Sequence, residues 1–332
     1  MLRRHLLALG AAAAVGAPIK GLGELLNVDG SPAPAPLPSH LHRVHISQVQ
    51  DLTRSLREAI HAHGSQPQVS GAAAAWADRL LGVSGADAVR LPLMTAVADL
   101  HAVAGWAGLD AGLQNRTMYH YARTLELATE SGDAYLQAAA VACAGLTMLE
   151  HGHPNDGLKM LQLGQIKAWN MPADHHLRKV VEACAQADAA TALARIGHPK
   201  AASAELAKSR DIWQPSHTEP WGDPNGAAAQ LEIEQGNLDR AEPFAVASVR
   251  RWDGVSERGR TLSTVVLATI HVHAGEPDGL TMAHRAITDV TKLSSVQARK
   301  RLEPLASALD TRRGSDAREL ARMARQVAAT RV

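Results

Sequence analysis

Five glycines recur along this chain at a nearly constant spacing, and each one separates two long apolar-rich segments. The glycines lie 40, 45, 39 and 39 residues apart: Gly112, Gly152, Gly197, Gly236 and Gly275. A fixed period of roughly 20 to 50 residues is the sequence signature of a stacked repeat array. The spacing therefore predicts an array of similar units, in which the step from the second glycine to the third is irregular.

The composition indicates that these units are helical. Hydrophobic residues make up 46% of the 332 residues, but aromatic residues only 3%, and alanine supplies much of the apolar content. Alanine is the best helix former, whereas strands favour β-branched and aromatic residues. We therefore expect an all-α fold, a helical-hairpin repeat array of the tetratricopeptide (TPR-like) α-solenoid type with a short N-terminal extension.

The turns between the expected helices carry the chemistry of helix ends. Pro154, Pro199 and Pro277 follow a glycine closely and fit the first turn of a helix, while Asp133 and Asp174 fit N-cap positions. These signals predict five helix pairs: 89–110 with 114–130, 133–151 with 154–169, 174–196 with 199–213, 223–235 with 238–252, and 257–274 with 277–292.

Along the chain we expect four segments. Residues 1–46 form a lead-in and a Pro-rich linker, 47–88 form N-terminal helices, 89–292 the repeats, and 293–332 C-terminal capping helices. The Arg-Arg pair and the apolar run in residues 1–17 resemble a signal peptide incompletely, so we expect a cytoplasmic protein, with export as the alternative. No run is long and apolar enough to span a membrane.

Charge does not point to nucleic acid, because the formal net charge is only +1. The last 41 residues nevertheless hold ten Lys and Arg against four Asp and Glu. Such an excess is typical of a solvated helix face, and it would also suit docking of an acidic partner or nucleic acid.

No motif predicts catalysis, a metal or a cofactor, so we expect a protein that is not an enzyme. Cys143 and Cys184 lie in Ala-rich helical stretches and fit buried structural thiols. Four His-x-His pairs occur, but residues two apart on a helix point in different directions and no recognisable ligand accompanies them. There is no nucleophile elbow, phosphate-binding loop or dinucleotide fingerprint.

Tryptophans and one histidine pair are the candidate binding residues. Trp169, Trp213 and Trp252 fall 16 or 17 residues after their glycines, at the ends of second helices. Such rings wedge against the next repeat or line a ligand groove on the concave face. The remaining candidates are Trp106, Trp221 in a Pro-rich loop, and His175 and His176 in the irregular step.

Several stretches resemble the ligand-sensing, TPR-like C-terminal region of actinobacterial helix-turn-helix (XRE-type) transcriptional regulators. They are AGWAGLDAG (104–112), LELATESGD (125–133), GLKMLQLGQIKAW (157–169), LATIHVHAGEP (267–277), KLSSVQARKRLEPLA (292–306) and DARELARMARQVA (316–328). The resemblance implies that the repeats bind a peptide, a small effector or a protein partner in a concave groove, in the service of transcriptional regulation, with a homodimer as a possible assembly. No helix-turn-helix pattern is recognisable in the chain, so direct DNA binding is not expected.

Three alternatives stay open. The array could be an interaction scaffold that works through its basic C-terminal face and takes no small ligand. It could be an enzyme on a helical-repeat frame, which a closed polar pocket with convergent carboxylates or histidines would favour. It could bind DNA through the array itself, which a mobility shift at low salt would reveal.

Overall fold

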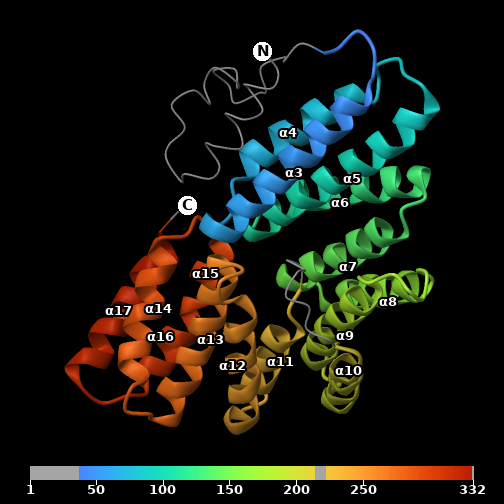
Figure 1. Ribbon diagram of the computed structural model, residues 1–332. Helices are drawn as coiled ribbons and strands as arrows, with labels where there is room; N and C mark the ends of the chain where they lie inside the picture. Colours follow the sequence, from blue (N-terminus) through green and yellow to red (C-terminus); the bar gives the residue numbers. More distant parts are fainter. Residues whose placement is uncertain (1–36, 214–221, 331–332) are drawn as a thin grey trace.

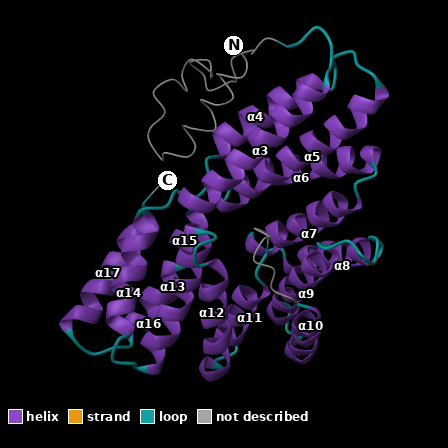
Figure 2. Cartoon of the chain, viewed as in Figure 1, coloured by secondary structure: helices purple, strands orange, loops and turns teal. Residues whose placement is uncertain are grey.

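The computed structural model describes residues 37–213 and 222–330, which are helical almost throughout (Figure 2). In these two stretches the isolated bridge between Gly64 and Ser294 is the only β-type pairing. The N-terminal extension that the sequence predicts lies mostly outside them. The helices, in chain order, are α3 (Arg43–His63), α4 (Pro67–Leu80), α5 (Asp87–Asp110), α6 (Gln114–Ser131), α7 (Ala134–Glu150), α8 (Pro154–Trp169), α9 (Arg178–Arg195), α10 (Pro199–Ile212), α11 (Pro224–Glu234), α12 (Leu238–Trp252), α13 (Glu257–Ala274), α14 (Gly279–Thr291), α15 (Val296–Lys300), α16 (Leu302–Asp310) and α17 (Ser315–Ala329).

The fold is the all-α, TPR-like array of sequential hairpins that the glycine period predicts. Helices α5 to α14 pack as five successive pairs, each pair against the next (Figure 1). The five glycines adopt φ between 71° and 86°, a left-handed conformation that closes a helix most readily with glycine. Pro154 and Pro199 begin α8 and α10, and the Asp133 carboxylate accepts a 2.8 Å bond from the Leu136 amide at the start of α7.

Three predicted helix starts are wrong. Helix α9 begins at Arg178, not at Asp174, because residues 171–177 form turns and Leu177 takes the N-cap position. Helix α14 begins at Gly279, so Pro277 lies before it rather than in its first turn. Helix α3 begins at Arg43, four residues before the predicted Ser47, because the His45 ring accepts the His42 amide at 2.9 Å and supplies an N-terminal cap.

Small residues after each glycine bring the two helices of a pair close together. Thr117, Ala202 and Ala241, each five residues after its glycine, are fully buried. At Gly157 a Cβ atom would lie 2.9 Å from the Gly145 carbonyl oxygen on the facing helix α7. These recurring positions are therefore packing positions.

The array closes on itself. Helices α3 and α5 near the N-terminus contact α13 and α15 near the C-terminus (Figure 1). The Ser294 amide donates to the His63 carbonyl oxygen at 2.8 Å, and the Ser65 amide donates to the Ser294 carbonyl oxygen at 2.8 Å. Helices α15 to α17 pack together and contact α13 and α14. The division into four segments stays a prediction.

A buried carboxylate holds this closure together. Asp110, at the end of α5, is 0% exposed and accepts from Arg258 Nε at 2.8 Å and Arg258 Nη2 at 2.5 Å. It also accepts from Ser295 Oγ at 2.7 Å and from the Ser65 amide at 3.2 Å. We call Asp110, Arg258, Ser295 and Ser65 the closing seam. Because Oδ1 accepts three of these bonds and Oδ2 the fourth, the seam satisfies a charge that would otherwise be costly to bury.

No helix among the described residues is long and apolar enough to cross a membrane.

Candidate functional site

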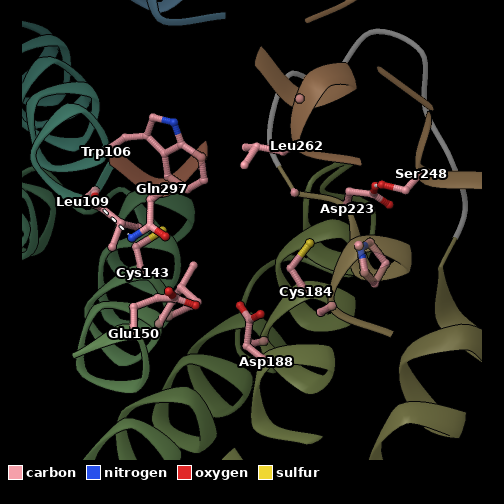
Figure 3. Close-up of a pocket in the computed structure, with 18 of the residues that line it drawn as sticks. Trp106, Leu109, Cys143, Glu150, Cys184, Asp188, Asp223, Ser248, Leu262 and Gln297 are labelled. Atoms are coloured by element: carbon pink, nitrogen blue, oxygen red, sulfur yellow. Dashed lines mark hydrogen bonds between the residues drawn. The ribbon is translucent and has the colours of Figure 1, made fainter. Parts of the chain in front are cut away.

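The first helix of each pair faces the inside of the closed array. Helices α5, α7, α9, α11 and α13 surround a cavity of about 260 Å³, part of whose lining Figure 3 shows. Arg258 of the closing seam also lines it. Much of the lining is small or aliphatic: Ala139, Leu146, Val180, Val181, Ala185 and Leu262. Such a mainly apolar hollow with a few polar groups is the usual form of a small-molecule site.

Two carboxylates enter the cavity from neighbouring helices. Glu150 is the last residue of α7, and Asp188 lies in the middle of α9, in an otherwise Ala-rich stretch (Figure 3). Neither carboxylate receives a hydrogen bond or ion pair from any described residue. Burial raises the pKa of Asp188 to about 7, and the Glu150 charge adds to the rise, while Arg195 and Arg301 oppose it. Asp188 is therefore protonated far more readily than an ordinary aspartate.

The guanidinium of Arg301 lines the same cavity from the junction of α15 and α16. Its buried Nε has no hydrogen-bond partner, and no carboxylate of the described chain lies within the 4.0 Å of an ion pair. Burial lowers the pKa of Arg301, and the charge of Glu150 opposes that effect. We call Glu150, Asp188 and Arg301 the charged cluster. Polar groups buried without partners are rare in folded proteins, and each one asks for an explanation.

The two cysteines also line the cavity. Burial raises the pKa of Cys143 to about 12 and that of Cys184 well above its ordinary value. Both thiols therefore stay protonated at neutral pH and are poor nucleophiles. Both are free cysteines, and each is partly buried rather than fully buried as the sequence predicts.

At the seam side, His61 and Ser256 form a pair that resembles part of a hydrolase dyad. His61 Nδ1 lies 2.9 Å from Ser256 Oγ. However, Ser256 Oγ also accepts the Gly259 amide as the N-cap of α13, and Ser256 is only 3% exposed. Burial and the charges of three arginines lower the pKa of His61 to about 4, which makes it a weak base. The pair therefore serves packing and capping.

A hydroxyl network lies across the cavity from the carboxylates. Asp223 caps α11 through the Asn225 amide and accepts a short bond from Ser248 Oγ on α12. Ser248 Oγ lies 2.6 Å from Ser263 Oγ on α13, so these groups tie three helices together.

The structure brings two of the predicted binding residues to the cavity. Trp106 on α5 and Trp252 on α12 line it, with Arg258 lying 5.3 Å from the Trp106 ring centroid and the His61 ring stacked on Trp252 at 6.2 Å. Trp252 also packs closely on Gly259.

The other predicted residues lie elsewhere. Trp169 is 66% exposed on α8 with Arg178 4.7 Å above its ring, and Trp213 follows α10 and is partly buried. The rings of His175 and His176 stack at 5.2 Å, and His175 stacks on Tyr135, a cavity residue, at 5.9 Å. Trp221 lies outside the described residues. The three phased tryptophans thus occupy three different environments.

Sequence reasoning missed the charged cluster. One signal was available, because Asp188 is a lone charge in the run ACAQADAATALA of a buried helix. A charge inside an apolar helix is unfavourable unless it is paired or functional. Nothing local marks Arg301, which reaches the cavity only because the array closes.

Neither the residues nor the geometry points to a bound metal. In the part of the chain that the structure describes, no group of three His, Cys, Asp or Glu converges as metal ligands do.

No protein-family model and no curated protein matches this sequence. Among solved structures, the apo form of the quorum sensor NprR from B. thuringiensis is similar, with a TM-score of 0.47. The sequences are 15% identical, over 78% of this chain and 81% of that chain. The similarity concerns the helical-repeat fold alone.

Proposed function

We propose that this protein is a TPR-like sensor that binds a peptide segment or a small effector in the cavity inside its closed array. The observation that carries the proposal is the charged cluster, in which three ionisable side chains line a mainly apolar cavity without partners. A ligand that matched them would gain charge-assisted hydrogen bonds in a desolvated place. The resemblance of the sequence to sensor regions of helix-turn-helix regulators supports a role in transcriptional regulation.

The mode of signalling follows from the closure. Because first helices on both sides of the seam line the cavity, a ligand would contact both ends of the array at once. Binding would therefore favour the closed form over any opened form in proportion to its difference in affinity for the two. A protein partner or a second copy of the chain would bind the outer surface of the closed form and of the opened form with different affinity.

Native mass spectrometry of the gently purified full chain tests the proposal. We expect the parent protein to carry the additional mass of a co-purified ligand. The Ala139→Phe variant, whose new side chain fills the cavity from α7, should lack that mass. Ala207→Phe, on the exposed face of α10, is the matched control and should keep the mass. Retention of the same ligand by Ala139→Phe, with its fold intact by circular dichroism, would place binding outside the cavity.

An enzyme is the second candidate, because two carboxyl groups line the same cavity. A carboxyl group with a pKa near 7 beside a second carboxyl group is an arrangement used for proton transfer. Against it, none of the described hydroxyl or thiol groups in the cavity is activated as a nucleophile. A ligand recovered chemically unchanged after prolonged incubation favours the sensor, and conversion that stops in Asp188→Asn favours the enzyme.

An interaction scaffold would use the basic C-terminal face, and that face has less unpaired positive charge than the residue count indicates. Arg322 pairs with Glu319 at 2.6 Å, and Arg325 pairs with Asp310, so part of the basic excess is neutralised within α16 and α17.

A further inference from the structure

The charged cluster combines both signs of charge in a way that selects for a class of ligand. Glu150 and Asp188 offer four carboxylate oxygens without a donor, and Arg301 offers guanidinium N–H groups without an acceptor. These side chains act electrostatically on one another, yet Arg301 lies more than 4.0 Å from both carboxylates. The fold therefore holds the opposite charges apart instead of pairing them.

The other charged groups around Asp188 are already engaged with this chain. Each has a partner at hydrogen-bond or ion-pair distance: Arg195 with Glu234, Arg258 with Asp110, Asp223 with Ser248, and the His61 ring with Ser256. Both thiols are neutral. The unmatched groups among these are thus two acceptors and one donor.

We propose that the cavity binds a small zwitterion of the α-amino acid type, whose ammonium group lies against Glu150 and Asp188 and whose carboxylate pairs with Arg301. This inference rests on the proposed function and names the ligand of the same site. Three ammonium N–H donors suit the two carboxylates, and a guanidinium fork matches a carboxylate in bidentate geometry. The aliphatic lining from α7 and α9 takes the side chain of the ligand.

Other ligand classes match the cluster less completely. A phosphate or a dicarboxylate would satisfy Arg301 but would face Glu150 and Asp188 with like charge. A simple amine would satisfy the carboxylates but would leave the buried Nε of Arg301 without an acceptor. Unpaired buried groups of this kind are what discriminates strongly between ligands.

Isothermal titration calorimetry of the full chain with each of the twenty free α-amino acids tests the inference. We expect at least one amino acid with an aliphatic or small side chain to bind. Its N-acetyl derivative and its methyl ester, which each remove one charge, should bind about 30-fold more weakly or worse. Equal binding of either blocked derivative would overturn the zwitterion.

Variants of the cluster residues test which side chain binds the ammonium group of the ligand and which binds its carboxylate. Arg301→Gln should weaken binding of the free amino acid by about 30-fold or more and leave binding of its methyl ester nearly unchanged. Arg301→Lys should keep part of the affinity for the free amino acid. Asp188→Asn should weaken binding of the free amino acid and of its methyl ester, and should change the affinity for the N-acetyl derivative least. Arg318→Gln and Glu130→Gln, both exposed, are matched charge controls and should bind as the parent does. Circular dichroism of every variant separates loss of binding from loss of fold.

The pH dependence gives an independent readout. Because an ammonium group favours the ionised form of Asp188, binding should release protons and tighten as pH rises from 6 to 8. The release should vanish in Asp188→Asn.

The experiments distinguish a wrong ligand class from a wrong binding site. If no amino acid binds at millimolar concentration but native mass spectrometry finds a ligand that Ala139→Phe loses, the sensor function stands and the zwitterion is wrong. If no ligand of any kind depends on the cavity, both are wrong.

Discussion

Asp110 at the closing seam accepts four hydrogen bonds, whereas Asp188 in the charged cluster accepts none from the described residues. Both carboxylates come from first helices of the array, both lie near an arginine, and both are largely removed from bulk water. The difference is that Arg258 reaches Asp110 and Arg301 does not reach Asp188. The seam uses its charges to hold the fold, while the cluster keeps its charges available at a cost to stability.

The largest effect should follow from breaking the seam. Asp110→Ala leaves Arg258 buried without its partner, and it should lower the free energy of unfolding by about 3–5 kcal/mol, measured by urea denaturation. The control is Asp51→Ala, which removes only the exposed pair with Arg54 and should cost less than about 1 kcal/mol. Equal effects of the two variants would mean that the seam is no more than a surface contact.

Removing the charge of Asp188 should do the opposite and stabilise the protein. The folded-state pKa of Asp188 is raised from 3.8 to about 7, so its stabilising contribution is complete below pH 3.8 and is lost as pH rises through 7. The advantage of Asp188→Asn over the parent should therefore grow by about 4 kcal/mol between pH 4 and pH 8, with the largest gain at the high end. Thermal unfolding across that range measures it, and a gain that did not grow with pH would contradict an unpaired Asp188.

A smaller effect is expected from the hydroxyl of the seam. Ser295 donates to Asp110 and also caps α15 by accepting the Ala298 amide at 3.0 Å. Ser295→Ala should cost about 1–2 kcal/mol in the free energy of unfolding. Ser307→Ala on the exposed face of α16, where the hydroxyl bonds only to its own helix, should change stability by less than about 0.5 kcal/mol.

The smallest effect on stability should come from Glu150→Gln. This substitution is best followed through the pKa of Asp188. Glu150→Gln removes a negative charge that raises the pKa of Asp188, so that pKa should fall below 7 while burial keeps it above 3.8. The change in stability should stay under about 1 kcal/mol. Carbon-detected NMR titration of Asp188 measures the shift, and Glu130→Gln on α6 should leave it unchanged.

Local signals in the sequence predicted the repeat units well. Gly152 and Gly197 need a left-handed conformation, and Pro154 and Pro199 fit only the first turn of a helix, so each turn could be read from a few residues. The starts of α9 and α14 were placed wrongly because Asp174 and Pro277 also fit the turns that precede these helices. Propensity at a helix end does not distinguish those neighbouring positions.

The candidate site was predicted only in part, since Trp106 and Trp252 reach the cavity and Trp169 does not. Trp169 and Trp252 both end second helices, α8 and α12, yet only Trp252 lines the cavity. The local pattern of residues is the same for a ring that faces the cavity and for one that faces solvent.

The sequence by itself determined the helical hairpins, their period and the small residues that let paired helices approach, because these depend on interactions between residues close along the chain. The tertiary structure alone decided that the array closes, that Asp110 meets Arg258 across 148 positions, and that Glu150, Asp188 and Arg301 share one cavity. These contacts depend on the small rotation between successive pairs, which accumulates over the whole array and which no local stretch of sequence records.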